Sequence, residues 1–214
     1  MKIDIVISDS KHPLCPILSS WALRHSEHRI RMFHELGQAD GGDWLVLVAC
    51  QEIAKPIVRD RYRRCVVTHA SDLPQGRGWS PAVWDILQGK DRIVLSLIEA
   101  SEPVDSGRVF EKFQAPVLPT DLHADINRIL GTLVLRALDF ILDNPDAEPS
   151  PQKGEPTRYR KRTVEDSRLD PSQSIASQFD LLRVCDPERY PAFFELFGER
   201  FELIVRKSAR NRTP

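Results

Sequence analysis

Trp44-Leu45-Val46-Leu47-Val48-Ala49 is the stretch that decides the fold of this chain. It is continuously apolar and follows Gly41-Gly42-Asp43, as expected for a strand that is buried on both faces of a parallel sheet. Four further strand candidates are residues 3–7, 29–33, 65–68 and 93–98. Helical patterns alternate with these runs, so the sequence predicts an α/β protein.

Three helices are expected between and after the strands. His12-Pro13-Leu14-Cys15-Pro16 opens the first, which carries Leu18 and Trp21. Ser80, followed by Pro81 and later by Gly89, predicts a short helix with Ser80 as its N-cap. From residue 122 to 141, apolar positions keep helical spacing over about five turns, so this helix should pack on the sheet.

The composition changes after residue 142. Residues 143–156 are rich in Pro, Asp and Glu and have little to bury, which predicts a linker. Beyond it, residues 193–205 form two strand candidates joined at Gly198-Glu199, with glycine first as a type II′ hairpin turn prefers. We therefore predict a main domain over 1–142, a linker over 143–156 and a small C-terminal α+β region over 157–214.

Charge and composition exclude several classes of protein. The chain has 214 residues and a formal net charge of -1, so it carries no overall field for nucleic acid. Its four cysteines include no Cys-x-x-Cys pair, which argues against a zinc site or a disulfide framework and favours a reducing compartment. No run approaches the ~20 apolar residues of a membrane span. We expect a cytoplasmic protein without a metal, a nucleic-acid partner or a membrane span.

The most informative loop follows the strand candidate at residues 65–68. It reads His69-Ala70-Ser71-Asp72-Leu73-Pro74 and continues through Gln75-Gly76-Arg77-Gly78-Trp79-Ser80-Pro81. A histidine that follows a strand and precedes such a loop is suited to acid–base chemistry, although alone it is more often a capping residue. Val104-Asp105-Ser106-Gly107, usually only a turn, follows the strand candidate at 93–98. His69 and Asp105 should therefore meet at the carboxyl edge of one sheet.

Together, these two segments resemble the signature motifs of the folate-dependent formyltransferases: His-x-Ser-x-Leu-Pro-x-x-Arg-Gly, then Asp, a small residue and Gly. The resemblance covers most of the chain and is strongest over residues 65–107 and 157–197. It implies a Rossmann-like, open, mostly parallel sheet with a small C-terminal α+β appendage, and formyl-tetrahydrofolate as co-substrate. It also implies that His69 is the base and oxyanion partner, and that Asp105 tunes it and relays a proton to the folate.

One position departs from the pattern of that family. The family carries an asparagine two positions before the histidine, where it helps to hold the formyl oxygen, and this chain has Val67. Valine cannot donate a hydrogen bond. Either other donors, such as backbone N–H groups of the loop, hold the oxyanion, or the activity is weak or absent.

The resemblance also suggests binding residues. The main chain of the loop at Cys50, Gln51, Glu52 and Ile53 corresponds by position to the folate pocket, although an ordinary strand-to-helix loop is an equal alternative. Candidate acceptor-binding residues are Ser71, Arg77, Gly78 and Trp79, of which Arg77 either binds an anionic substrate or is a solvated loop charge.

The acceptor is suggested by two further features. Ser8-Asp9-Ser10-Lys11-His12-Pro13 differs from the Gly-Thr-Pro-x-Phe stretch of methionyl-tRNA formyltransferases, which argues against tRNA. Trp79-Ser80-Pro81 and the tail at residues 157–207 resemble the branch that formylates nucleotide-linked amino sugars for surface polysaccharides. The basic segment Arg158 to Arg162 either binds a diphosphate or is a solvated edge strand.

Three alternatives stay open from the sequence. The acceptor could be another small amine, such as an amino acid derivative or glycinamide ribonucleotide. The chain could also be a non-catalytic relative that binds folate or a sugar nucleotide. The aromatic hairpin at residues 193–201 either covers a core or forms a homodimer interface.

Overall fold

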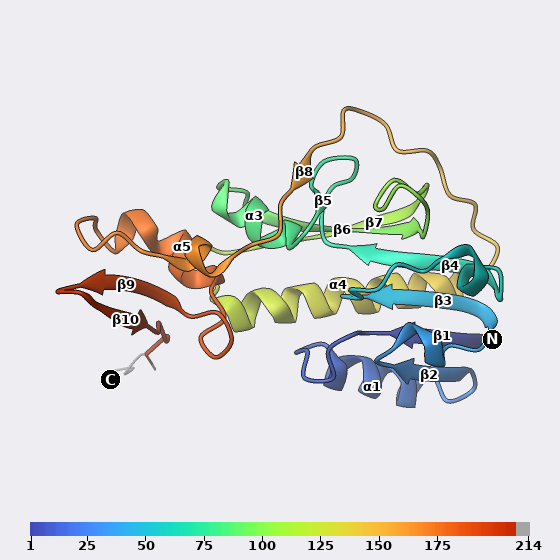
Figure 1. Cartoon of the computed structure of the whole chain (residues 1–214). Helices are drawn as coiled ribbons and strands as arrows, with labels where there is room; N and C mark the ends of the chain where they lie inside the picture. Colours follow the sequence, from blue (N-terminus) through green and yellow to red (C-terminus); the bar gives the residue numbers. More distant parts are fainter. Residues whose placement is uncertain (209–214) are drawn as a thin grey trace, which may run out of the picture.

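A six-stranded sheet in the order β2-β1-β3-β4-β6-β7 forms the centre of the computed structural model, which describes residues 1–208 (Figure 1). The strands are β1 (Lys2–Val6), β2 (Arg29–Phe33), β3 (Gly42–Val48), β4 (Tyr62–His69), β6 (Arg92–Glu99) and β7 (Val109–Pro116). The four strands from β2 to β4 pair in parallel, whereas β6 and β7 pair antiparallel. The predicted mostly parallel, Rossmann-like fold is therefore confirmed, although the sequence analysis did not identify β7.

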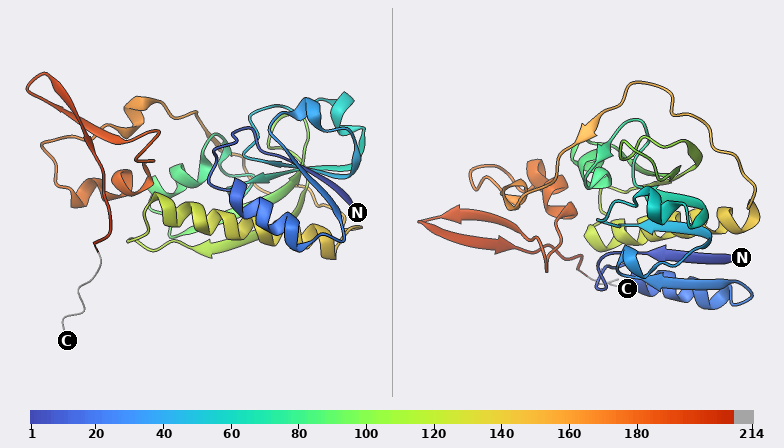
Figure 2. Two further views of the ribbon diagram at one scale, coloured as in Figure 1. Left: turned by 90° about the horizontal axis from the view of Figure 1, so that it is seen from below. Right: turned by 45° about the vertical axis from the view of Figure 1, so that its right-hand side comes forward.

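Two helices, α1 (Cys15–Arg24) and α4 (His123–Asp143), cover one face of the sheet (Figure 2). The predicted apolar stripe of α4 is buried there, and its buried residues include Ile126, Leu133, Val134, Ala137, Leu138 and Ile141. The indole N–H of Trp21 donates to a carboxylate oxygen of Asp139 at 2.7 Å, which ties α1 to α4. Within residues 1–208, no helix is both long enough and apolar enough to cross a bilayer.

Three short helices lie in the connections between strands. They are η1 (Leu36–Gln38), α2 (Pro56–Arg59) and α3 (Pro81–Leu87). Ser80 is the N-cap residue of α3, as predicted, although its side chain makes no capping hydrogen bond. Ser80 has φ 48° and ψ 45°, a left-handed conformation, whereas a capping side chain usually needs an extended backbone to reach the first amides.

The C-terminal region begins with β8 (Arg158–Tyr159), which pairs with β5 (Arg77–Gly78) of the histidine loop. It continues through η2 (Val164–Ser167), η3 (Ala176–Gln178), α5 (Phe179–Val184), β9 (Ala192–Leu196) and β10 (Glu199–Leu203). The turn between the last two strands is Phe197-Gly198, with φ 56° and 82°, so the predicted type II′ turn at Gly198-Glu199 is wrong. Two positive φ values are typical of type I′. Residues 209–214 of the predicted region lie outside the described residues.

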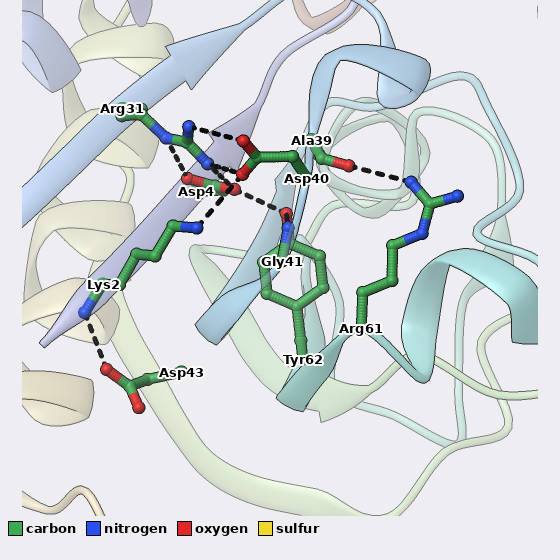
Figure 3. Close-up of polar contacts among 9 residues, drawn as sticks. All are labelled: Lys2, Asp4, Arg31, Ala39, Asp40, Gly41, Asp43, Arg61 and Tyr62. Atoms are coloured by element: carbon green, nitrogen blue, oxygen red, sulfur yellow. Dashed lines mark hydrogen bonds and ion pairs between the residues drawn. The ribbon is translucent and has the colours of Figure 1, made fainter.

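A buried charge cluster joins three strands of the sheet (Figure 3). The Asp4 side chain on β1 is fully buried and accepts hydrogen bonds from Arg31 Nε at 2.8 Å and from Tyr62 Oη at 2.5 Å. Arg31 also pairs with Asp40, and Tyr62 Oη accepts the Gly41 N–H at 3.0 Å. A buried carboxylate needs such partners to offset its desolvation. The cluster therefore fastens β2 and the loop at 39–41 to the sheet.

Candidate active site

His69 ends β4 and lies on the sheet face opposite α1 and α4. Side chains alternate along a strand, so His69 shares this face with Val67, whereas Val66 points to the opposite face. Val66 accordingly packs in the core with α1 and α4, and Val67 packs in a separate apolar cluster on the face of His69. His69 is 7% exposed, and its Nε2 lies 2.9 Å from the Gly76 carbonyl oxygen. Because a carbonyl oxygen only accepts hydrogen bonds, Nε2 carries the proton in this arrangement.

Asp105 lies beside His69, in the turn between β6 and β7. One carboxylate oxygen is 3.4 Å from His69 Nδ1, and the other accepts the Gly78 N–H at 2.8 Å. The carboxylate is as well buried as the imidazole, and the residue adopts φ 62°. The pair could therefore exchange a proton with a bound substrate while the carboxylate balances the charge on the ring.

His69 and Asp105 were expected to meet because both follow strands that end at the same edge of the sheet, and that expectation is wrong. Because β6 runs antiparallel to β4, with Glu99 opposite Val66, the carboxyl end of β6 does not lie at the carboxyl edge of β4. Instead, the turn after β6 folds back over the sheet face towards His69. Gly107 makes this possible, since a Cβ at that position would lie 1.9 Å from the Glu99 carbonyl oxygen.

The acceptor-binding candidates occupy different environments. Trp79 is 44% exposed, whereas Ser71 is buried and its Oγ has no hydrogen-bond partner among the residues that the structure describes. Gly78 has φ 101°, and a Cβ there would lie 2.2 Å from the Tyr159 carbonyl oxygen. Arg77 is half-buried and donates from its Nη2 to Gln152 Oε1 at 2.6 Å. Of the four, Trp79 is the side chain most open to a ligand.

Gln152 is a residue of the site that the sequence analysis did not identify. Besides accepting from Arg77, it donates from Nε2 to the carbonyl oxygens of Asp105 and Gly107, at 2.9 and 2.8 Å. It lies in the segment predicted to be a linker. No local signal marked it, because its partners lie 45 to 75 residues away along the chain.

The loop at Cys50, Gln51, Glu52 and Ile53 follows β3, whose last residue pairs with Thr68, next to His69. The Gln51 N–H donates to Ser8 Oγ at 2.9 Å, and Glu52 Oε1 accepts the Leu36 N–H at 2.7 Å. Burial raises the pKa of the Cys50 thiol. The loop is thus fixed at two points while Gln51, Glu52 and Ile53 are exposed, an arrangement that suits recognition of a ligand by main-chain groups.

The basic segment is partly used within the molecule. Arg160 pairs with Asp166, and its hydrogen bonds to that carboxylate hold the pKa of Asp166 well below its usual range. Arg162 donates to the Asp166 carbonyl oxygen at 2.9 Å. Lys161 lies over the Trp79 ring, with its Nζ 4.7 Å from the ring centroid, and Arg158 is exposed. Arg158 and Lys161 are therefore the cations best placed for a ligand.

Known proteins of similar sequence and fold include formyltransferases. No protein-family profile matches the chain. The chain is 30% identical over 149 residues to the methionyl-tRNA formyltransferase of Bacteroides thetaiotaomicron, an alignment that covers 65% of this chain and 45% of that protein. The chain thus spans about half the length of the curated relatives it matches.

Two solved structures share the fold over nearly the whole chain. A methionyl-tRNA formyltransferase from Clostridium thermocellum has a TM-score of 0.83 and 21% identity, and the match covers 99% of this chain and 95% of that one. A sugar N-formyltransferase from a Shewanella species has a TM-score of 0.73 and 14% identity, covering 98% and 99%.

Proposed function

The chain belongs to the folate-dependent formyltransferase family, and from that premise we propose that it transfers the formyl group of formyl-tetrahydrofolate to a primary amine. The observation that carries this proposal is the buried pair of His69 and Asp105, 3.4 Å apart, beneath a glycine-rich loop. The co-substrate supplies an activated formyl carbon, and the chain supplies proton transfer and stabilisation of charge.

His69 is the proposed base. When the imidazole accepts the proton of the attacking amine it gains a positive charge, which the nearby Asp105 carboxylate stabilises. In the described arrangement Nε2 donates its proton to the Gly76 carbonyl, which orients the ring. To act as base through Nε2, the neutral imidazole carries its single proton on Nδ1, towards Asp105, and Nε2 exchanges the Gly76 carbonyl for the N–H of the attacking amine. The imidazolium then passes its Nδ1 proton to the Asp105 carboxylate, which relays it to the departing folate nitrogen and leaves His69 neutral.

Charge on the formyl oxygen needs donors other than a side chain at position 67. Val67 packs in an apolar cluster that includes Leu47 and Ala100, so it offers none. We assign this role to protonated His69 together with main-chain N–H groups of the histidine loop. The Gly78 N–H is already bonded to Asp105, so other amides of the loop would have to contribute.

The two substrates have separate proposed sites. The main chain of residues 50–53 suits the row of donors and acceptors on a pterin ring, because it is exposed and held in place. Trp79, Lys161 and Arg158 offer an aromatic face and positive charge, which fit a sugar linked to a nucleotide diphosphate. The fold shared with a sugar N-formyltransferase supports a nucleotide-linked amino sugar as acceptor. A cytoplasmic location and a homodimer belong to the same proposal.

A second candidate acceptor is another small amine, or the tRNA acted on by the curated relatives. An acceptor screen with formyl-tetrahydrofolate separates these possibilities. It would compare nucleotide-linked amino sugars, glycinamide ribonucleotide, amino acid derivatives and methionyl-tRNA, and follow formation of tetrahydrofolate and of the formylated product by mass spectrometry. We expect product with an amino sugar nucleotide and none with the His69→Ala variant. Binding of folate without product from any amine would instead show a non-catalytic relative.

A further inference from the structure

The segment at residues 150–159, here called the strap, crosses back over the sheet to the histidine loop (Figure 1). At one end, Ser150 and Val109 exchange two main-chain hydrogen bonds, of 2.7 and 2.8 Å. At the other end, Thr157 accepts the Arg77 N–H through its carbonyl oxygen at 2.9 Å and the Gly76 N–H through its Oγ1 at 2.8 Å. The strap is therefore fixed to the start of β7 at one end and to the histidine loop at the other.

Gln152 is the side chain through which the strap joins the Asp105 turn to the histidine loop. Its two amide hydrogens donate to the carbonyl oxygens of Asp105 and Gly107, and its oxygen accepts from Arg77. Each polar atom of the carboxamide is thus paired. Arg77 belongs to the loop that bonds His69 through the Gly76 carbonyl.

The turn that Gln152 holds is strained. Asp105 has φ 62°, in the left-handed region that residues other than glycine rarely adopt, so the turn persists only where its surroundings fix it. Gln152 bonds the carbonyl of Asp105 itself and that of the glycine two residues later. Loss of these two bonds would free the turn to relax and would change the distance between the Asp105 carboxylate and His69 Nδ1.

We propose that Gln152 is a positioning residue that holds the Asp105 turn against His69 and thereby sets the geometry of the proposed proton transfer. Its importance for catalysis rests on the proposed function, whereas its control of the turn does not. A small misplacement of a catalytic group can lower the rate by orders of magnitude.

The isosteric variant Gln152→Glu tests this proposal most sharply. At neutral pH its carboxylate still accepts from Arg77 but cannot donate to the two carbonyl groups. Gln152→Ala removes all three bonds. Lys153→Ala, at the exposed next residue of the strap, is the matched control. All are made in the full chain and compared by circular dichroism and thermal melting before use.

Hydrogen–deuterium exchange is the first readout, because it needs no activity. In Gln152→Glu and Gln152→Ala we expect at least about tenfold faster exchange in the peptides that span residues 70–80 and 101–108, with α4 and the Lys153→Ala control unchanged. Unchanged exchange in both peptides would overturn the proposal.

The second readout is formyl transfer. We expect kcat to fall at least about tenfold in Gln152→Glu while KM for formyl-tetrahydrofolate stays within about twofold. A kcat equal to that of Lys153→Ala, despite faster exchange, would overturn the catalytic part of the proposal. If the unaltered chain formylates no amine, the proposed function fails, and the exchange readout still decides whether Gln152 holds the turn.

Discussion

Replacement of Asp105 by asparagine removes one negative charge from the proposed site and changes little else. The side-chain oxygen of asparagine can still accept the Gly78 N–H, which is bonded to Asp105 at 2.8 Å. What is lost is the attraction between the carboxylate and a protonated His69, whose Nδ1 lies 3.4 Å away. The substitution therefore isolates the electrostatic part of the proposed mechanism.

The size of this effect follows from the distance. Two unit charges 3.4 Å apart attract each other by about 5 kcal/mol at an effective dielectric constant of ~20. Desolvation of the buried carboxylate offsets part of this attraction. If about half of it acts in the transition state, the barrier rises by ~2.5 kcal/mol and kcat falls about 70-fold.

The assay is steady-state formation of the formylated amine, with the acceptor found in the screen. The melting temperature should change by no more than about 4 °C, since the Gly78 bond is kept. Glu102→Gln, which removes an exposed carboxylate from the same turn, is the control and should keep full activity. A kcat for Asp105→Asn within about threefold of the unaltered enzyme would refute the role given to this carboxylate.

Three further predictions concern the frame of the site. Gly78→Ala places a Cβ 2.2 Å from the Tyr159 carbonyl oxygen, so the strap has to move away from the histidine loop and limited proteolysis should cut it faster. Gly89→Ala is the control, because Gly89 has a similar positive φ but no atom near its Cβ. Equal cleavage of the two variants would contradict this reasoning. Tyr62→Phe removes the bond to Asp4 and leaves the Gly41 N–H unpaired, so urea unfolding should show a loss of about 2–4 kcal/mol; a loss below about 1 kcal/mol would contradict the estimate. The pKa of Asp166 is lowered in the folded chain, chiefly by hydrogen bonds from Arg160, so its contribution to stability is present above the ordinary value of 3.8 and is lost as the pH falls below it. In thermal melts, Arg160→Gln should therefore lose less stability than the unaltered chain between pH 6 and pH 3, and an equal loss would contradict the assignment.

Local patterns predicted most of the sheet and α4, because those elements are buried and their apolar spacing is strong. The strand β7 was missed for a physical reason: it is an edge strand, and exposed residues such as Glu111, Lys112 and Gln114 interrupt its apolar pattern. The turn at Phe197 was placed one residue too late, since the glycine is second in a type I′ turn and first in a type II′ turn.

The candidate site was predictable only in part. His69 and Asp105 stand in recognisable motifs, and the structure brings them within 3.4 Å. The path between them was not predictable, because the antiparallel direction of β6 depends on pairing across the sheet rather than on its own sequence. Gln152 was missed because its partners are 47 and 75 residues away along the chain.

Those separations also set the order in which the site can be completed during synthesis. A chain emerges from its amino end, so His69 and Asp105 are made well before the strap. The sheet up to β7 and the helix α4 can pack while residues 150–159 are still being added, but the strained turn at Asp105 then lacks the Gln152 bonds. The proposed catalytic geometry would therefore be completed late, after the sheet itself has formed.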